Sequence, residues 1–232
     1  MALSSDGNTL AVGGPYDDGG KGATWIFVSE NNGSDYQQLG PKLVQSSARQ
    51  GKMISCIIIR TSIRECSSMM MMIHDFGGTL GFSVALSSNG STLAVGSPFD
   101  EDGKGATWVF VLVNKGTTTS YEQLGTKLVG NGWVYPARQG NKHNFCHEIN
   151  DFDKKNLRLN NTIFSVGWSV SLSSNGSILA VGGPVDGPSY TDRIGSTWLF
   201  EFNGSRYNQL GDKLVGTKYL GYSSQGKNQS SF

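Results

Sequence analysis

Cysteine and histidine are scarce in this 232-residue chain, with three of each, and none of the six lies in the repeated segments that dominate the sequence. Without cysteine, the repeats give no basis for a disulfide framework or a redox role. Without histidine, they contain nothing that resembles a Ser-His-Asp catalytic set. The six side chains fall at no usual zinc spacing, so chance composition explains them better than a metal site: Cys56, Cys66, His74, His143, Cys146 and His147.

A large net charge and long apolar runs are also lacking. The formal net charge is +1, which gives no reason to expect nucleic acid or an anionic membrane as a partner. No apolar run approaches the roughly 20 residues needed to span a bilayer. No secretory signal is visible either, because Met1 stands inside the first repeat, where Val84 and Val170 stand in the others. We therefore expect the natural protein to extend further towards its N-terminus.

The sequence contains an internal repeat with three copies, at 2–15, 85–98 and 171–184. Each copy is a variant of Ala-Leu-Ser-Ser-Asn-Gly-Ser-Thr-Leu-Ala-Val-Gly-Gly-Pro. Each copy continues through Gly-(Ala/Ser)-Thr-Trp into Gln-Leu-Gly-x-Lys-Leu-Val. An internal repeat of this kind fixes the architecture before any single residue is considered.

Each repeat predicts four strands. In the second copy, residues 82–87 alternate with period 2, and 92–95 return after Asn89-Gly90, a dipeptide typical of a type I′ hairpin turn. The β-branched and aromatic segment 106–113 and the segment 121–129 complete the set. Four antiparallel strands per unit make one propeller blade.

The segments Leu-Ala-Val-Gly-(Gly/Ser)-Pro and Gly-(Ala/Ser)-Thr-Trp-(Ile/Val/Leu)-Phe resemble FG-GAP repeats, the blade units of the integrin α-subunit head and of related secreted propellers. Gly81-Phe82 and Gly167-Trp168 stand for the "FG" element. The resemblance implies an all-β fold, a partial β-propeller of three four-stranded antiparallel blades with two irregular inter-blade inserts. It also implies an extracellular or cell-surface glycoprotein that acts in adhesion or binding.

These features divide the chain into six parts. The blades are expected at 1–51 (N-terminally truncated), 82–140 and 167–226, the inserts at 52–81 and 141–166, and a tail at 227–232. Both inserts follow Ala-Arg-Gln-Gly, and the codons for this glycine and for the next residue, Lys52 or Asn141, can together contain the GGTAA of a eukaryotic splice donor. One interpretation is therefore that the inserts and the tail at 227–232 are retained intron read as protein. The other is a pair of genuine loops of unusual length.

Many FG-GAP blades carry an Asp-x-Asp-x-Asp-Gly calcium loop, and this chain departs from that pattern. It has Ser4-Ser-Asp-Gly7, Ser87-Ser-Asn-Gly90 and Ser173-Ser-Asn-Gly176 at the matching places. One carboxylate or amide per loop cannot supply the six to eight oxygens that calcium prefers. We therefore carry no calcium site over and expect no cofactor.

An acidic loop after each Gly-x-Pro is the best candidate for a ligand or cation site, because clustered carboxylates on one propeller face can hold a cation or a basic ligand. Solvated turn acids explain the loops equally well. The candidate residues are Asp17, Asp18, Asp100, Glu101, Asp102, Asp186 and Asp192.

Asn-x-Ser/Thr sequons at Asn32, Asn89, Asn175 and Asn203 are glycosylation candidates in a secreted protein. The alternative is that Asn-Gly serves the hairpin and serine follows by composition. Three tryptophans and three phenylalanines recur at two strand positions that share a face. We expect this set to pack between blades: Trp25, Trp108, Trp198, Phe27, Phe110 and Phe200.

We find no catalytic constellation, so the sequence predicts a chain that is not an enzyme, with a protein or glycan ligand contacted through inter-strand loops and further blades of a longer chain as partners. The alternatives are a propeller hydrolase for glycans or phospholipid head groups, with carboxylates among Asp17, Asp100, Asp102 and Asp192, or an inactive fragment.

Overall fold

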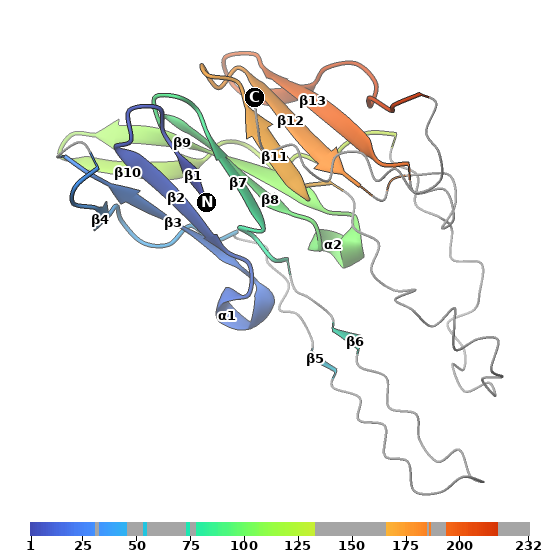
Figure 1. The fold of residues 1–232 in the computed structure, drawn as a ribbon, viewed down its shortest axis with the longest axis horizontal. Coiled ribbons are helices and arrows are strands. Elements are labelled where there is room, and N and C mark those ends of the chain that lie inside the picture. The colour runs from blue at the N-terminus through green and yellow to red at the C-terminus, as the bar shows by residue number, and fades with distance from the viewer. Residues whose placement is uncertain are drawn as a thin grey trace, which may run out of the picture.

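The computed structural model describes residues 1–30, 33–45, 53–54, 73–74, 78–132, 166–184, 186 and 194–217. These residues form three four-stranded antiparallel sheets that lie one after another (Figure 1). The first sheet holds β1 (Ala2–Leu3), β2 (Thr9–Gly14), β3 (Ala23–Val28) and β4 (Gln37–Gln38). The second holds β7 (Ser83–Leu86), β8 (Thr92–Ser97), β9 (Ala106–Lys115) and β10 (Thr118–Gln123).

The third sheet holds β11 (Ser169–Leu172), β12 (Ile178–Gly183), β13 (Ser196–Phe202) and β14 (Tyr207–Gln209). Strands follow chain order in every sheet, and equivalent residues pair in the same register: Val12 with Trp25, Val95 with Trp108, and Val181 with Trp198. The expected all-β class and the four antiparallel strands of each repeat are therefore confirmed.

Two further features were not expected. Short strands β5 (Met53–Ile54) and β6 (Ile73–His74) pair with each other, so the first insert is not wholly irregular. Single helical turns, α1 (Asp17–Gly20) and α2 (Asp100–Gly103), occupy the acidic loops of the first and second sheets. They lie at the same end of the molecule in Figure 1.

The turn between the first two strands of each sheet is built by a serine and an Asx side chain. In the second sheet the Gly90 N–H donates to the Ser87 carbonyl at 2.9 Å, and Asn89 Oδ1 accepts from the Ser91 N–H at 3.1 Å. Gly90 has a positive φ of 69°, whereas Asn89 does not. The expected type I′ turn, which needs positive φ at both residues, is therefore wrong. The asparagine prefers to bond its own turn backbone instead.

A tyrosine of each sheet closes the same turn from the far side. The hydroxyls of Tyr36, Tyr121 and Tyr207 donate to the carbonyls of Gly7, Gly90 and Gly176. Burial raises the pKa of Tyr121 and of Tyr207 to about 12. The fourth strand is thus tied to the first hairpin in every repeat.

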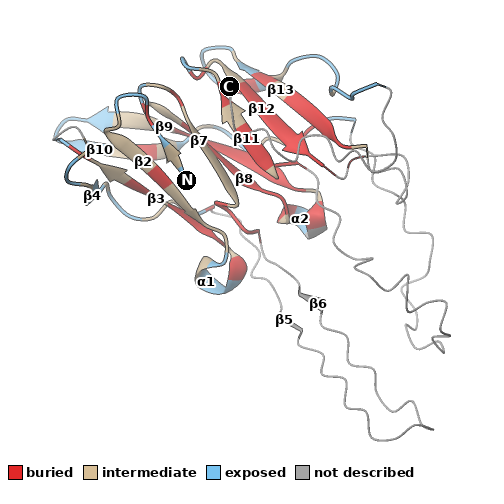
Figure 2. Cartoon of the chain, in the orientation of Figure 1, coloured by how far each residue is buried: buried red, intermediate tan, exposed pale blue. Residues whose placement is uncertain are grey.

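The core lies between the sheets, where two clusters of buried apolar side chains join neighbouring sheets, and Figure 2 shows buried residues along β8, β12 and β13. Trp108 and Phe110 of the second sheet pack against Ala11 and Ile26 of the first. Trp198 of the third sheet packs in the same way, in one cluster with Ala94 and Val109 of the second. Trp25 and Phe27 on the outer face of the first sheet are only half-buried. The aromatic face of the second sheet and that of the third, which carry the Trp and Phe residues, therefore pack on the aliphatic face of the sheet before them.

Backbone bonds fix how neighbouring sheets meet at the turn end. The Ser5 N–H donates to the Ser88 carbonyl, and the Ser88 N–H donates to the Ser174 carbonyl, both at 2.8 Å. The first strands are close to one another as well, since β7 contacts both β1 and β11. Each step from sheet to sheet thus repeats the same geometry.

Glycines allow the closest approach at the other end. Gly167 has a φ of 87°, and a Cβ there would lie 2.3 Å from the Ala106 carbonyl oxygen. The residues just before the two equivalent glycines, Leu80 and Val166, are fully buried and form parallel bridges to Gly22 and Gly105. The ends of both inserts therefore belong to the packed contact between sheets.

Among the described residues, no helix is long and apolar enough to cross a membrane.

Candidate functional site

The acidic loop of each sheet is held by a lysine from the end of the same sheet. Asp17 pairs with Lys42, Asp100 with Lys127, and Asp186 with Lys213. Each lysine is the invariant one of the Gln-Leu-Gly-x-Lys-Leu-Val segment. The third strand lies between loop and lysine in the sheet, which is why residues 25 to 27 positions apart meet.

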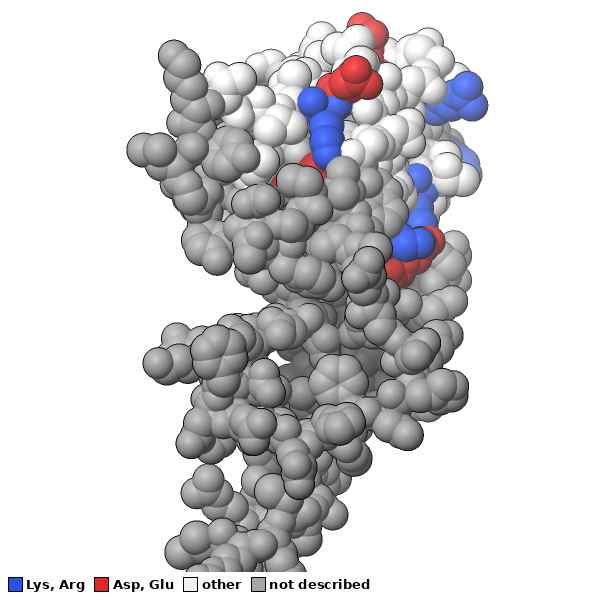
Figure 3. Space-filling view, turned by 90° about the vertical axis from the view of Figure 1, so that its right-hand side faces the viewer, with Lys and Arg blue, Asp and Glu red and all other residues white. Residues whose placement is uncertain are grey.

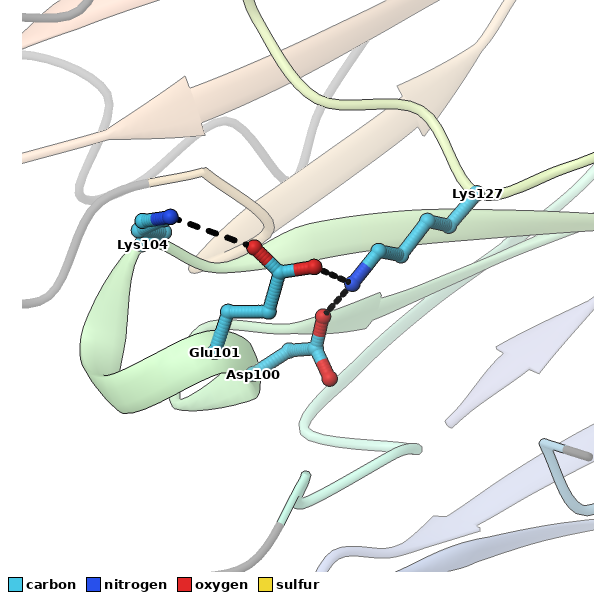
Figure 4. A network of polar contacts seen from close by, with 4 residues as sticks. All are labelled: Asp100, Glu101, Lys104 and Lys127. Carbon is cyan, nitrogen blue, oxygen red and sulfur yellow. Dashed lines mark hydrogen bonds and ion pairs between the residues drawn. The ribbon is translucent and has the colours of Figure 1, made fainter. Parts of the chain in front are cut away.

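The second loop forms the largest of these networks (Figure 4). Lys127 Nζ donates to Asp100 and, at 2.6 Å, to Glu101 Oε1, while Lys104 Nζ lies 3.4 Å from Glu101 Oε2. Glu101 adopts a positive φ of 48°, which is uncommon for a residue with a side chain. The hydrogen bond from Lys127 holds the pKa of Glu101 below its usual value.

Lys127 is charged despite its partial burial. Burial lowers its pKa, but the hydrogen bonds to Asp100 and Glu101 outweigh this and raise the pKa overall. Its ammonium also lies 5.8 Å from the centre of the Trp108 ring, as that of Lys42 lies 6.0 Å from Trp25. The lysine therefore joins the loop to the tryptophan strand.

The third loop shows the same pairing with a more deeply buried acid. Asp186 Oδ2 accepts from Lys213 Nζ and from the hydroxyl of Ser196, and the Asp186 side chain is almost fully buried. Because Asp186 and Asp100 are buried and paired, neither projects a carboxylate towards a ligand.

The first loop presents more of its surface to solvent. Asp18 also has a positive φ of 48°, and its carboxylate accepts from Lys21 Nζ at 2.7 Å, which lowers the pKa of Asp18. Tyr16, directly before this loop, is 66% exposed. An exposed aromatic residue and a carboxylate–ammonium pair thus occur within six residues of one loop.

Figure 3 shows acidic and basic side chains beside each other near the top and at the lower right of the described surface, while other basic side chains at the right-hand edge have no acidic neighbour in this view. Within the described ranges, no group of three or more His, Cys, Asp or Glu residues could hold a metal ion. Asp6, in the loop that corresponds to a calcium loop, is used internally, since its carboxylate accepts from the Ser4 hydroxyl and the Asn8 N–H.

Several predicted residues cannot be placed. Asp192 and Asn32 lie outside the described residues, as does the side chain of Asp102. The structure brings each of Asp17, Asp100 and Asp186 to its own lysine and does not bring the three loops together into one cluster. Sequence reasoning missed these lysines, although their threefold recurrence was the signal that could have found them.

The described sequons share one arrangement. Asn89, Asn175 and Asn203 are exposed, and the Oδ1 of each accepts from the hydroxyl of the serine two residues later at 2.8, 2.8 and 3.0 Å. All three lie on the turns opposite the acidic loops.

Comparison with known proteins gives little. No family model matches the chain, and no curated protein matches it. Among solved structures, one named as a "putative 6-phosphogluconolactonase" from Bacteroides uniformis is similar at 10% sequence identity, with a TM-score of 0.33. The similarity covers 92% of this chain and 53% of that one, so this chain spans about half of its length.

These findings correct two expectations. The resemblance to FG-GAP repeats is wrong, because no such family matches and the structural likeness is to a protein of another name. The expectation that the chain is not an enzyme is contradicted by that name, which is that of an enzyme. At a TM-score of 0.33 the likeness carries no argument for that activity here.

Proposed function

We propose that the three sheets are consecutive blades of a propeller-type scaffold that binds an uncharged glycan through the loops at the acidic end. The blade arrangement is supported by the repeated packing of an aromatic face on an aliphatic face and by the repeated serine backbone hydrogen bond between sheets. Such scaffolds carry their function in the loops that the rigid strands position.

The observation that carries the glycan proposal is the exposed Tyr16, two residues before Asp18, which forms an ion pair with Lys21 on the same loop. A tyrosine offers a flat apolar face together with a polar hydroxyl, at little cost in side-chain entropy. The neighbouring carboxylate and ammonium supply an acceptor and donors for sugar hydroxyl groups. Since their charges cancel, they favour an uncharged ligand over an acidic or a basic one.

The test is binding of the purified chain to an array of neutral oligosaccharides, followed by titration of the best ligand. Tyr16→Ala should weaken binding about tenfold, which corresponds to about 1.4 kcal/mol, and Tyr16→Phe should retain it. Glu122→Gln is the matched control, because it removes an exposed ion pair with Lys115 on a strand hairpin away from the acidic loops. No binding to any neutral glycan, or equal binding by Tyr16→Ala, would contradict the proposal.

The proposal includes an extracellular or cell-surface location, which the exposed sequons support. When the chain is secreted from eukaryotic cells behind an added signal peptide, Asn203 should carry a glycan. The mass removed by an N-glycosidase should decrease in Asn203→Gln. An unmodified Asn203 peptide in the secreted protein would speak against this location.

A further inference from the structure

We propose that two copies of this chain associate head to tail, with the outer face of the first sheet of one copy packed on the outer face of the third sheet of the other. Two copies would then supply six sheets, within the range of about four to eight that closes a propeller ring. This inference rests on the blade arrangement proposed above and is independent of the glycan.

The outer face of the first sheet is its aromatic face, and it is partly exposed. The equivalent face is buried in the second and in the third sheet. Leu3 is 55% exposed, whereas the equivalent Leu172 of the third sheet is 8% exposed. The remaining members of this face are half-buried in the first sheet, and every one has a buried equivalent in both other sheets: Leu10, Val12, Trp25, Phe27 and Tyr36.

The outer face of the third sheet is the second surface of the proposed contact. In the first sheet Leu39 and Leu43 pack against the core shared with the next sheet, and Leu124 and Leu128 of the second sheet do the same. Their equivalents in the third sheet, Leu210 and Leu214, are 46% and 54% exposed. No other sheet among the described residues covers them.

The two faces match because the chain already joins such faces twice. An aromatic face meets an aliphatic face at both internal junctions, so a third junction of the same kind needs no new complementarity. It would also add one more backbone hydrogen bond of the kind found between neighbouring sheets. Within one chain the Ser5 N–H donates to Ser88 and the Ser88 N–H donates to Ser174, so the Ser174 N–H of one copy would donate to the Ser5 carbonyl of the other. Such a contact joins two different surfaces, and it ends as a closed ring only if the rotation per sheet allows closure.

The experiment is sedimentation velocity of the full chain and of two variants, Leu3→Asp on the first face and Leu214→Asp on the other. The parent chain should be a dimer, and each variant alone should be a monomer, because a carboxylate in an apolar contact is desolvated without a partner. Both leucines are exposed in the single chain, so folding should survive, and circular dichroism checks this. Thr118→Asp, at an exposed position of the second sheet, which contributes to neither outer face, is the control and should remain a dimer.

Mixing the two variants separates head-to-tail contact from symmetric contact. In an equal mixture, the unchanged first face of Leu214→Asp can pack on the unchanged third face of Leu3→Asp, so one intact junction forms and a dimer returns. A symmetric contact would leave one variant dimeric by itself. A parent chain that is monomeric at every concentration, as expected if these faces instead meet sheets of a longer protein, would overturn the proposal. An unlimited series of oligomers would overturn the closed pair.

Discussion

Lys127 has three roles at once: it neutralises the buried Asp100, orients Glu101 and lies over the ring of Trp108. Its equivalents in the other sheets repeat the first role. Since the carboxylate of Asp100 is nearly buried, removing the cation leaves a desolvated charge, which costs more than losing a surface ion pair.

We therefore expect Lys127→Met to lower the free energy of unfolding by about 1–3 kcal/mol, measured by urea denaturation at neutral pH. The control is Lys115→Met, which breaks the exposed pair with Glu122 and should cost less than about 1 kcal/mol. Equal losses in the two variants would show that Asp100 does not depend on its lysine.

The buried tyrosines make stability depend on alkaline pH. Burial raises the folded-state pKa of Tyr121 and Tyr207 to about 12, above the unfolded value of 10. Each therefore contributes stability that is fully present below about pH 10 and is lost as the pH rises from about 10 to about 12. Urea midpoints across this range should fall less steeply in Tyr121→Phe than in the parent chain. The same slope in both would contradict the assignment.

At the scale of elements, close contact between neighbouring sheets depends on glycine. Gly167 combines a positive φ with backbone atoms of Ala106 and Ser97 next to its Cβ position, whereas Gly116, at the tip of the β9–β10 hairpin, has a positive φ of 64° and open space around its Cβ position. An alanine at Gly116 would therefore meet backbone strain alone, whereas an alanine at Gly167 would meet both backbone strain and a steric clash.

Gly167→Ala should lower the free energy of unfolding by about 2–5 kcal/mol, because it adds a clash with the Ala106 carbonyl to the strain of a left-handed residue. Gly116→Ala should cost only the strain, about 1–2 kcal/mol. Thermal or urea unfolding of both variants measures the difference. If the two losses were the same, the sheets would not meet as closely as the structure shows.

At the scale of the whole molecule, the sheets form a row in which each contacts only its neighbours. The second sheet is covered on both faces, and the other two are each covered on one by a described sheet. Stability in such arrays is close to a sum of terms from each unit and each neighbouring contact.

Amide hydrogen exchange should therefore be slowest in the second sheet. In monomeric Leu3→Asp, the Val95 amide should exchange more slowly than those of the equivalent Val12 and Val181, because its sheet opens only when two contacts are lost. Exchange measured by NMR or mass spectrometry checks this order. Uniform exchange over the three sheets would mean that they open together.

The sequence alone determined the number of repeats, the four strands in each and the alternation that makes the tryptophans and phenylalanines share a face. These follow from local spacing: period 2, turn residues and a threefold recurrence. It did not determine the turn type at Asn89-Gly90, where side-chain hydrogen bonding outweighed the dipeptide preference. Only the tertiary structure decided that Asp17, Asp100 and Asp186 are held by lysines. It alone showed which faces stay uncovered, because both depend on contacts between residues far apart in the chain.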